Sequence, residues 1–116
     1  MNSSAFDAIK LLSSSFRRKF DDFEGIYLFG LFTDGREHVD EDIEVVALFG
    51  SQSKEKREEI WRIVGKVETD MNVCLDLYPY TQDDFKQDEE VYDEVMKSGI
   101  FFDKLGIRQD KEEKNG

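Results

Sequence analysis

The sequence predicts a domain of the α/β (α+β) class, in which a mixed β-sheet carries helices on one face. Two observations favour this class. Two long segments repeat apolar residues at three- and four-residue steps, which is the period of one helix face, and three shorter segments are apolar throughout or alternate, as strands do. A chain of 116 residues with 39% hydrophobic and 13% aromatic residues is large enough for one domain with a small core.

The first half of the chain predicts a helix, a strand, a loop and a second strand. Apolar residues from Phe6 to Phe20 share one helical face. Ile26–Phe29 follows a glycine as a short buried strand, and the segment from Leu31 to Glu41 is polar and acidic, which is typical of a loop. Ile43–Phe49 is nearly all apolar and is predicted to be the second strand.

The second half predicts further helices and two further strands. The predicted elements are a helix from near Lys54 to Met71, a strand Val73–Tyr78 that Pro79 ends, a capped helix start at Thr81, a helix Glu90–Ser98 and a short edge strand Ile100–Phe102. We expect Trp61 to lie on the apolar stripe of the first of these helices, and therefore in the core. Residues 1–105 would form the domain, and residues 106–116 would form a charged, flexible tail.

The charge balance restricts the partners. The chain has 16 Lys and Arg against 27 Asp and Glu, which gives a formal net charge of −11. This balance disfavours free DNA or RNA, because phosphate binding needs a basic face. It is compatible with a nucleotide that arrives with Mg²⁺, and equally with a basic protein partner.

The sequence shows no signal for secretion or membrane insertion. The N-terminus has neither the basic segment nor the apolar region of a signal peptide, and no run of about 18 apolar residues is present. We therefore expect a cytoplasmic protein with no membrane partner. Cys74 is the single cysteine, which excludes an internal disulfide framework and a Cys-rich metal site, and we expect it to be a small buried residue.

Two carboxylates stand at the head of the second predicted strand. Asp42 and Glu44 are separated by one residue, so in a strand they project from one face, about 7 Å apart along the chain. Two like charges raise each other's pKa unless a cation lies between them, so the pair suggests a divalent metal site. Asp76 belongs to the third predicted strand and lies on the face opposite to the apolar residues of that strand.

The spacing of these residues resembles the signature of minimal nucleotidyltransferases, which are small members of the DNA polymerase β superfamily. That family carries Gly-Ser, ten residues and then Asp-x-Asp. Here Gly30-Leu31, ten residues and Asp42-Ile43-Glu44 fall in the same register. Leu31 stands in place of the serine, and Glu44 stands in place of the second aspartate.

Other positions extend the resemblance from about Gly25 to Phe102. Gly35 matches a glycine that closes the family's turn after Gly-Ser, and Asp76 matches a third carboxylate on a neighbouring strand. The segment Tyr78–Phe85 resembles the turn and helix start that follow that strand in the family.

The resemblance implies a nucleotidyltransferase-like mixed β-sheet and a chemistry. In that chemistry an NMP group, AMP from ATP for preference, is transferred to a protein or small-molecule hydroxyl with Mg²⁺ or Mn²⁺. The implied metal ligands and catalytic residues are Asp42, Glu44 and Asp76, and the implied nucleotide contacts are Gly30, Leu31 and Arg36. Minimal nucleotidyltransferases are commonly paired with a small helical partner in toxin–antitoxin modules, as the antitoxin, so we expect such a partner or a homo-oligomer.

A second class of function stays open, namely a catalytically degenerate acidic module that acts by binding a partner protein. Leu31 offers no hydroxyl to phosphate, and Asp34 stands where the family often has a basic residue. Loss of one charge-assisted contact weakens binding by about 1.5–3 kcal/mol. His38, the single histidine, is expected to be a surface residue of the loop rather than a catalytic base.

Overall fold

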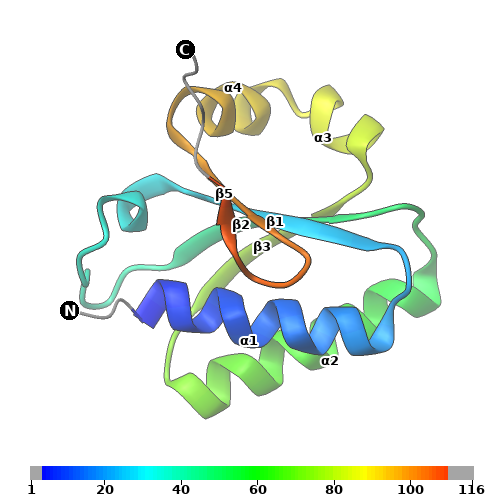
Figure 1. Ribbon diagram of the computed structural model, residues 1–116, viewed down its shortest axis with the longest axis horizontal. Helices are drawn as coiled ribbons and strands as arrows, with labels where there is room; N and C mark the ends of the chain where they lie inside the picture. The colour runs from blue at the N-terminus through cyan, green and yellow to red at the C-terminus, as the bar shows by residue number, and fades with distance from the viewer. Residues whose placement is uncertain (1–3, 110–116) are drawn as a thin grey trace.

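The computed structural model describes residues 4–109 and contains a five-stranded sheet in the order β3-β2-β1-β4-β5 (Figure 1). The elements are α1 (Ser4–Lys19), β1 (Phe23–Phe29), the 3-10 helix η1 (Gly30–Asp34), β2 (Ile43–Phe49), α2 (Lys54–Met71), β3 (Leu75–Tyr80), α3 (Gln82–Gln87), α4 (Glu89–Ser98), β4 (Ile100–Asp103) and β5 (Arg108–Gln109). Strands β2 and β3 are parallel and the other neighbouring pairs are antiparallel, so the sheet is mixed. The predicted class and the predicted adjacency of the first three strands are confirmed.

Helices cover both faces of this sheet (Figure 1). Helices α1 and α2 pack on the face that carries Ile43, Val45 and Ala47 of β2. Helices α3 and α4 pack on the opposite face, which carries Val46 and Leu48. The expectation that the helices pack on one face therefore holds for α1 and α2 only. Because β2 is apolar on both faces, both need a covering layer to be removed from water.

Strand β3 lies at one edge of the sheet and runs through Pro79, so the prediction that Pro79 ends this strand was wrong. Proline is tolerated on an edge strand when its missing N–H would face outward. The N–H of Ile43 donates to the carbonyl of Cys74 at 2.9 Å. In a parallel ladder of this register, Leu75 and Pro79 turn their backbone groups away from β2.

The half-buried ammonium group of Lys56 holds together the end of the sheet remote from the acidic loop. The Nζ atom of Lys56 lies 2.5 Å from Oδ2 of Asp22 and donates to the carbonyl of Ser51 at 2.9 Å. It also lies 5.7 Å and 5.5 Å from the ring centres of Phe20 and Phe49. These contacts connect the α1–β1 turn to the β2–α2 turn.

Trp61 of α2 lies on the surface of the fold. Trp61 is 48% exposed, so the prediction that it belongs to the core was wrong. The core-facing residues of α2 are Ile60, Val64 and Val67, and Trp61 lies about 100° around the helix from Ile60.

None of the helices within residues 4–109 is long and apolar enough to cross a membrane.

The C-terminal boundary differs from the expected one at residue 105. Strand β5 (Arg108–Gln109) pairs with β4, so the sheet continues past the point where the tail was expected to begin. Strand β4 is consequently not an edge strand, although its predicted position is confirmed. The rest of the expected tail, residues 110–116, lies outside the described residues.

Candidate functional site

The register of the sheet brings two of the predicted site residues together. Glu44 of β2 is opposite Asp76 of β3 and opposite Phe29 of β1. Both carboxylates lie on the α3 and α4 face of the sheet, because their neighbours along each strand, Val46 and Tyr78, belong to the apolar cluster on that face. The prediction that Asp76 projects from the face opposite to the apolar residues of its strand is therefore confirmed.

Gly30 lies directly against Glu44. It begins η1 with a left-handed backbone, at φ 80°, immediately after β1. A Cβ atom placed on Gly30 would overlap the carboxylate of Glu44 and would lie 2.9 Å from its Cδ atom. A side chain at position 30 would thus displace the carboxylate. Glycine is favoured here for two reasons: its left-handed backbone and the lack of space beside Glu44.

The electrostatic environment of Glu44 is uniformly acidic. Burial raises the pKa of the Glu44 carboxyl above its usual value, and the charges of Glu94, Asp76, Asp42 and Glu41 raise it further. All of these influences disfavour the ionised form. A cation at this position would offset them.

Glu94 is a site residue that sequence reasoning missed. It belongs to α4, and its charge acts on Glu44 more strongly than that of Asp76 or Asp42. Glu94 lies 50 residues after Glu44 in the sequence, and its spacing within α4 gives no signal of the site. Only the packing of α4 over this face of the sheet brings it near (Figure 1).

Asp42 and the loop before it are more exposed than the strand carboxylates. Asp42 precedes β2 and is exposed, whereas Glu44 and Asp76 are half-buried. Carboxylate oxygens are the ligands that Mg²⁺ and Mn²⁺ prefer, so the chemical type of these side chains suits such an ion. In the described part of the chain, no three carboxylate, imidazole or thiol groups are arranged so that they could hold one ion.

Asp34 organises the loop that follows η1. Its carboxylate oxygens each lie 3.0 Å from Nε2 of His38, and Oδ1 accepts the backbone N–H of Arg36 at 2.8 Å. The hydrogen bond from Arg36 and then that from His38 lower the pKa of Asp34. Gly35 is left-handed at φ 78° and its N–H donates to the carbonyl of Phe32, so it closes the turn as expected.

The predicted nucleotide contacts beside Gly30 are both exposed. Leu31 is 51% exposed at the first turn of η1. The Nε atom of Arg36 lies 3.5 Å from Oδ2 of Asp34, and the Arg36 side chain is 82% exposed. A role of either residue in nucleotide binding stays a prediction.

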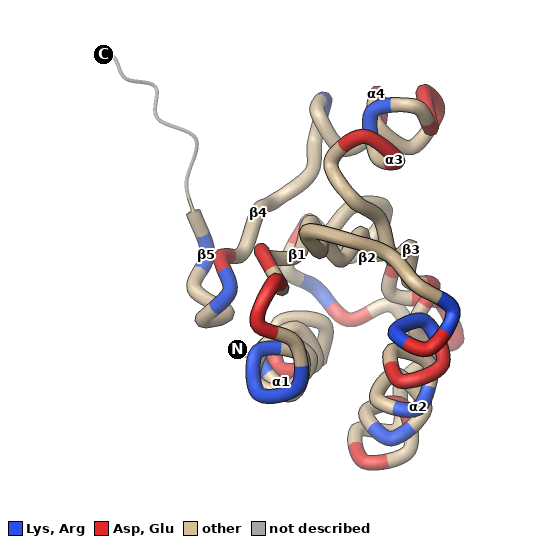
Figure 2. The backbone as a smooth tube through the Cα atoms, turned by 90° about the vertical axis from the view of Figure 1, so that its right-hand side faces the viewer, with Lys and Arg blue, Asp and Glu red and all other residues tan. Residues whose placement is uncertain are grey.

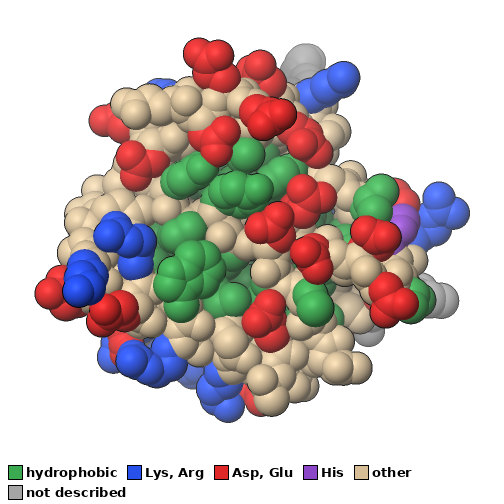
Figure 3. Space-filling model, turned by 180° about the vertical axis from the view of Figure 1, so that it is seen from behind, with side chains coloured by type: hydrophobic (Ala, Val, Ile, Leu, Met, Phe, Trp, Pro, Cys, Tyr) green, Lys and Arg blue, Asp and Glu red, His purple; other side chains and the backbone are tan. Residues whose placement is uncertain are grey.

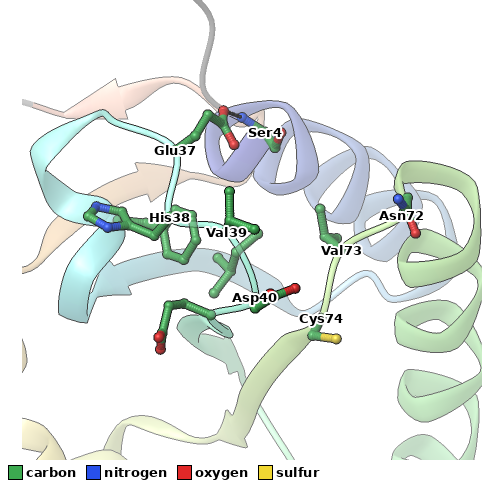
Figure 4. Close-up of a pocket in the computed structure, with 11 residues that line it drawn as sticks. Ser4, Glu37, His38, Val39, Asp40, Asn72, Val73 and Cys74 are labelled. Atoms are coloured by element: carbon green, nitrogen blue, oxygen red, sulfur yellow. Dashed lines mark hydrogen bonds between the residues drawn. The ribbon is translucent and has the colours of Figure 1, made fainter.

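A cavity of about 460 Å³ lies at the edge of the sheet near this loop (Figure 4). Its lining combines loop residues such as His38, Val39 and Asp40 with Cys74. Cys74 is exposed, so the expectation that it is buried was wrong, because it precedes β3 instead of lying within it. Figure 4 shows the His38 ring pointing away from Cys74, so the two do not form a thiol–imidazole pair.

His38 is only partly a surface residue. Its side chain is 23% exposed, and its ring packs edge-on against Phe32, with ring centres 5.0 Å apart. Its contacts with Asp34 and Phe32 help to hold the loop. The expectation that His38 is not a catalytic base stays a prediction.

No family model matches the sequence, and no curated protein matches it. Solved structures do match the fold. A chain of a toxin–antitoxin complex with AMP-PNP superposes with a TM-score of 0.57 at 22% identity, over 81% of this chain and 68% of that chain. A chain of a mutant MntA–HpeT toxin–antitoxin complex gives a TM-score of 0.56 at 20% identity, over 76% of this chain and 66% of that chain.

A third match is a candidate nucleotidyltransferase from Sulfolobus solfataricus, with a TM-score of 0.54 at 16% identity over 88% of both chains. The fold of this chain is therefore that of a minimal nucleotidyltransferase domain. It spans 66% of the length of the MntA–HpeT chain that it matches.

Proposed function

We propose that this chain is the nucleotidyltransferase-like member of a toxin–antitoxin pair, and that it transfers AMP from ATP to a hydroxyl of its partner protein or of a small molecule. Its fold matches chains from toxin–antitoxin complexes, one of them with AMP-PNP. The partner protein or the small molecule would supply the acceptor hydroxyl.

The placement of Glu44 beside Asp76, with Gly30 against Glu44, is the observation that carries the proposal. Glu44 and Asp76, which the sheet places side by side, would hold Mg²⁺ or Mn²⁺, and exposed Asp42 would turn toward them to complete the site, because the described residues do not gather the three carboxylates around one point. Gly30, the backbone N–H of Leu31 and Arg36 would face the phosphates. The bound ion would offset the negative charge shared by the carboxylates and the triphosphate.

The residues of this chain would then position the reactants. The acceptor oxygen would form a bond to the α-phosphorus of ATP as the bond to the bridging oxygen breaks, pyrophosphate would leave, and the proton of the acceptor hydroxyl would pass to solvent water. Gly30 would let the phosphates approach the backbone at the start of η1. It also leaves the Glu44 carboxylate in place, which a side chain at position 30 would displace.

Two observations favour the second candidate function, an acidic binding module without activity. Leu31 presents an apolar side chain where the family has a hydroxyl, and Glu94 adds a further negative charge facing Glu44. Both changes would weaken triphosphate binding unless a cation compensates. Binding of a basic partner would need neither the hydroxyl nor the ion.

Transfer of labelled AMP distinguishes the two functions. The purified chain is incubated with labelled ATP, Mg²⁺ or Mn²⁺, and the protein encoded by the neighbouring gene. Transfer that Asp42→Asn and Asp76→Asn each abolish supports the transferase. Asp83→Asn is the matched control, because Asp83 is exposed on α3 and lies outside the proposed site.

Complex formation with the partner protein is measured in parallel, so that an experiment without AMP transfer can also be interpreted. A stable complex without transfer, unchanged in Asp42→Asn, would support the binding module. The absence of both transfer and complex formation would contradict the toxin–antitoxin proposal. Mg²⁺ should also raise the melting temperature of the chain but not that of Asp42→Asn, because a ligand that binds only the folded state stabilises it.

A further inference from the structure

A second cavity, of about 490 Å³, lies where the layer formed by α3 and α4 ends. Its lining comes from the last turn of α4 and from β1, β4 and β5. Figure 2 shows α3 and α4 over β1, β2 and β3, with β4 and β5 extending beyond them at one edge of the sheet. None of Asp42, Glu44 and Asp76 lines this cavity, so it is separate from the candidate functional site.

Two aromatic rings form the floor of this cavity. Tyr27 of β1 and Phe101 of β4 are paired across the sheet, with ring centres 4.8 Å apart. A Cβ atom placed on Gly25 would lie 2.5 Å from Cζ of Phe101, so the Phe101 ring occupies the space above this glycine. The glycine thus lets the ring lie across the neighbouring strand. The outer face of the half-buried ring is then turned toward the cavity, which Phe101 lines.

The charge of the lining is opposite to that of the surface around it. Lys97 in the last turn of α4 and Arg108 of β5 line the cavity, and of the described residues no Asp or Glu does so. Lys97 makes no hydrogen bond or ion pair with another residue of the range 4–109. Figure 3 shows acidic side chains grouped over the upper part of the molecule, where α3 and α4 lie. The cavity therefore suits an anion in an otherwise acidic region.

The carboxylate of Asp103, which projects from the same face of β4 as Phe101, is already bound by donors of the fold. Its Oδ1 atom accepts the N–H of Leu105 at 2.9 Å and that of Ile107 at 3.1 Å. Its Oδ2 atom accepts Nε2 of Gln109 at 3.0 Å. These bonds hold Asp103 to the β4–β5 turn, so its carboxylate does not take up Lys97.

We propose that this cavity binds a nucleoside phosphate, with the base stacked on the outer face of Phe101 and the phosphate held by Lys97 and Arg108. Every base has a π-face that stacks on an aromatic ring, and guanidinium and ammonium groups both bind phosphate. A volume of about 490 Å³ is within the range of ligand pockets, which is ~300–1,000 Å³. The C-terminal end of α4 carries partial negative charge, so it suits the N–H groups of a base better than the phosphate.

The ligand is a free nucleotide and not the end of a nucleic acid. A phosphate monoester carries a charge of about −1.5 to −2 at pH 7, which one Lys and one Arg match. The net charge of −11 would repel a polymer with many phosphates. The proposal goes beyond the transfer of AMP and does not depend on it, because the cavity uses neither the carboxylates of the candidate site nor a metal ion.

A nuclear magnetic resonance titration of the full chain with AMP, in EDTA and without divalent ions, tests the proposal. Omitting the metal keeps AMP from being drawn to the carboxylates of the candidate site. We expect the amide signals of Gly99, Phe101 and Gln109 to shift, with a dissociation constant in the submillimolar range, while those of Gly30 and Gly35 stay in place. Adenosine lacks the phosphate and inorganic phosphate lacks the base, so each should bind at least tenfold more weakly than AMP.

Two variants test the two halves of the cavity separately. Lys97→Gln removes one cation at an exposed position and should weaken AMP binding at least threefold. Phe101→Leu keeps an apolar side chain but removes the stacking face, and should weaken AMP binding about tenfold. Lys86→Gln is the matched control, because Lys86 is an exposed cation of α3 outside the cavity, and this variant should bind AMP as the wild type does.

Three results would overturn the proposal. The first is a spectrum that does not change at several millimolar AMP. The second is a set of shifts confined to η1 and β2, which would place AMP in the candidate functional site. The third is equal AMP binding by the wild type and Lys97→Gln together with equal binding of AMP and adenosine, because the phosphate would then make no contact. This third comparison stays decisive even if Phe101→Leu fails to fold.

Discussion

The backbone of Gly30 and the carboxylate of Glu44 occupy adjoining space, so that a Cβ atom on Gly30 would overlap that carboxylate. Fourteen positions separate the two residues in the sequence, and the antiparallel pairing of β1 with β2 brings them together. The turn that would face the phosphates and a carboxylate that would face the metal are thus coupled through packing. The coupling persists although Leu31 has replaced the serine of the motif.

Gly30→Ala should destabilise the fold more than Gly35→Ala. Both glycines are left-handed, at φ 80° and 78°, so the strained backbone of an alanine at either position should lower the free energy of unfolding by about 1–2 kcal/mol. Only position 30 adds a clash with Glu44, because nothing lies within 4 Å of a Cβ atom on Gly35. Urea denaturation measures the difference. Glu44→Ala should restore part of the loss in the Gly30→Ala background, and equal losses at both positions would contradict the packing argument.

Glu44→Gln should stabilise the metal-free protein at neutral pH. Burial and the neighbouring charges of Glu94, Asp76, Asp42 and Glu41 raise the pKa of Glu44 above the usual 4.5 in the folded state. The folded state then binds more protons than the unfolded state, so the free energy of unfolding falls as pH rises through 4.5 and upward to the raised pKa. Glutamine removes this loss.

The gain from Glu44→Gln should disappear below pH 4.5, where Glu44 is protonated in both states. Urea denaturation at acidic and neutral pH, without divalent ions, measures it. Asp83→Asn, which removes an exposed carboxylate on α3 outside the site, is the matched control and is measured under the same conditions. A variant that is less stable than the wild type at neutral pH would show that the Glu44 carboxylate is favourably placed even without a cation.

Lys56→Met should destabilise the protein by about 1–3 kcal/mol, because it leaves the Asp22 carboxylate without its charged partner. Burial acts to raise the pKa of Asp22, but the hydrogen bonds from Lys56 and Ser51 outweigh it and hold the pKa below 3.8. That stabilisation is present above pH 3.8 and is lost as the pH falls through the lowered pKa. The defect of Lys56→Met should therefore shrink in acid.

Lys54→Met is the matched control for this ion pair, because Lys54 is exposed at the first turn of the same helix. Thermal and urea denaturation of both variants give the comparison. A similar loss in the two variants would show that Lys56 acts through its helix position and not through Asp22.

Leu31→Ser should raise AMP transfer at least tenfold if the chain is a weakened transferase. A hydroxyl at the start of η1 would restore one contact to phosphate, for which about 1.5–3 kcal/mol is expected in the transition state. Stability should change little, because Leu31 is 51% exposed. Leu31→Ala removes the same side chain without adding a hydroxyl and is the control.

Asp34→Arg would place a basic residue where the family often has one, but it is not a clean companion to Leu31→Ser. Asp34 receives hydrogen bonds from Arg36 and His38, so replacing it would disturb the loop as well as its charge. Transfer that is already high in the wild type and does not rise in Leu31→Ser would show that Leu31 is no defect.

The sequence by itself determined the order of α1, β1, β2, α2, β3, α3, α4 and β4, and the face of the sheet from which Glu44 and Asp76 project. These properties follow from local periodicity, because a residue's position within a strand fixes the side of the sheet on which it projects. Thr81 likewise begins α3 with a capping box that its own neighbour Asp84 completes.

Only the tertiary structure decided which element covers each face. Periodicity shows that a surface is apolar but does not identify the element that covers it. The sequence therefore did not predict that α4 would cover the site, or that the charge of Glu94 would act on Glu44. For the same reason Trp61, which the helical pattern placed in the core, lies outside it, and Pro79 is accepted within β3 because that strand is an edge. Packing between distant segments sets burial and electrostatic environment, and neither can be read from the residues of one segment alone.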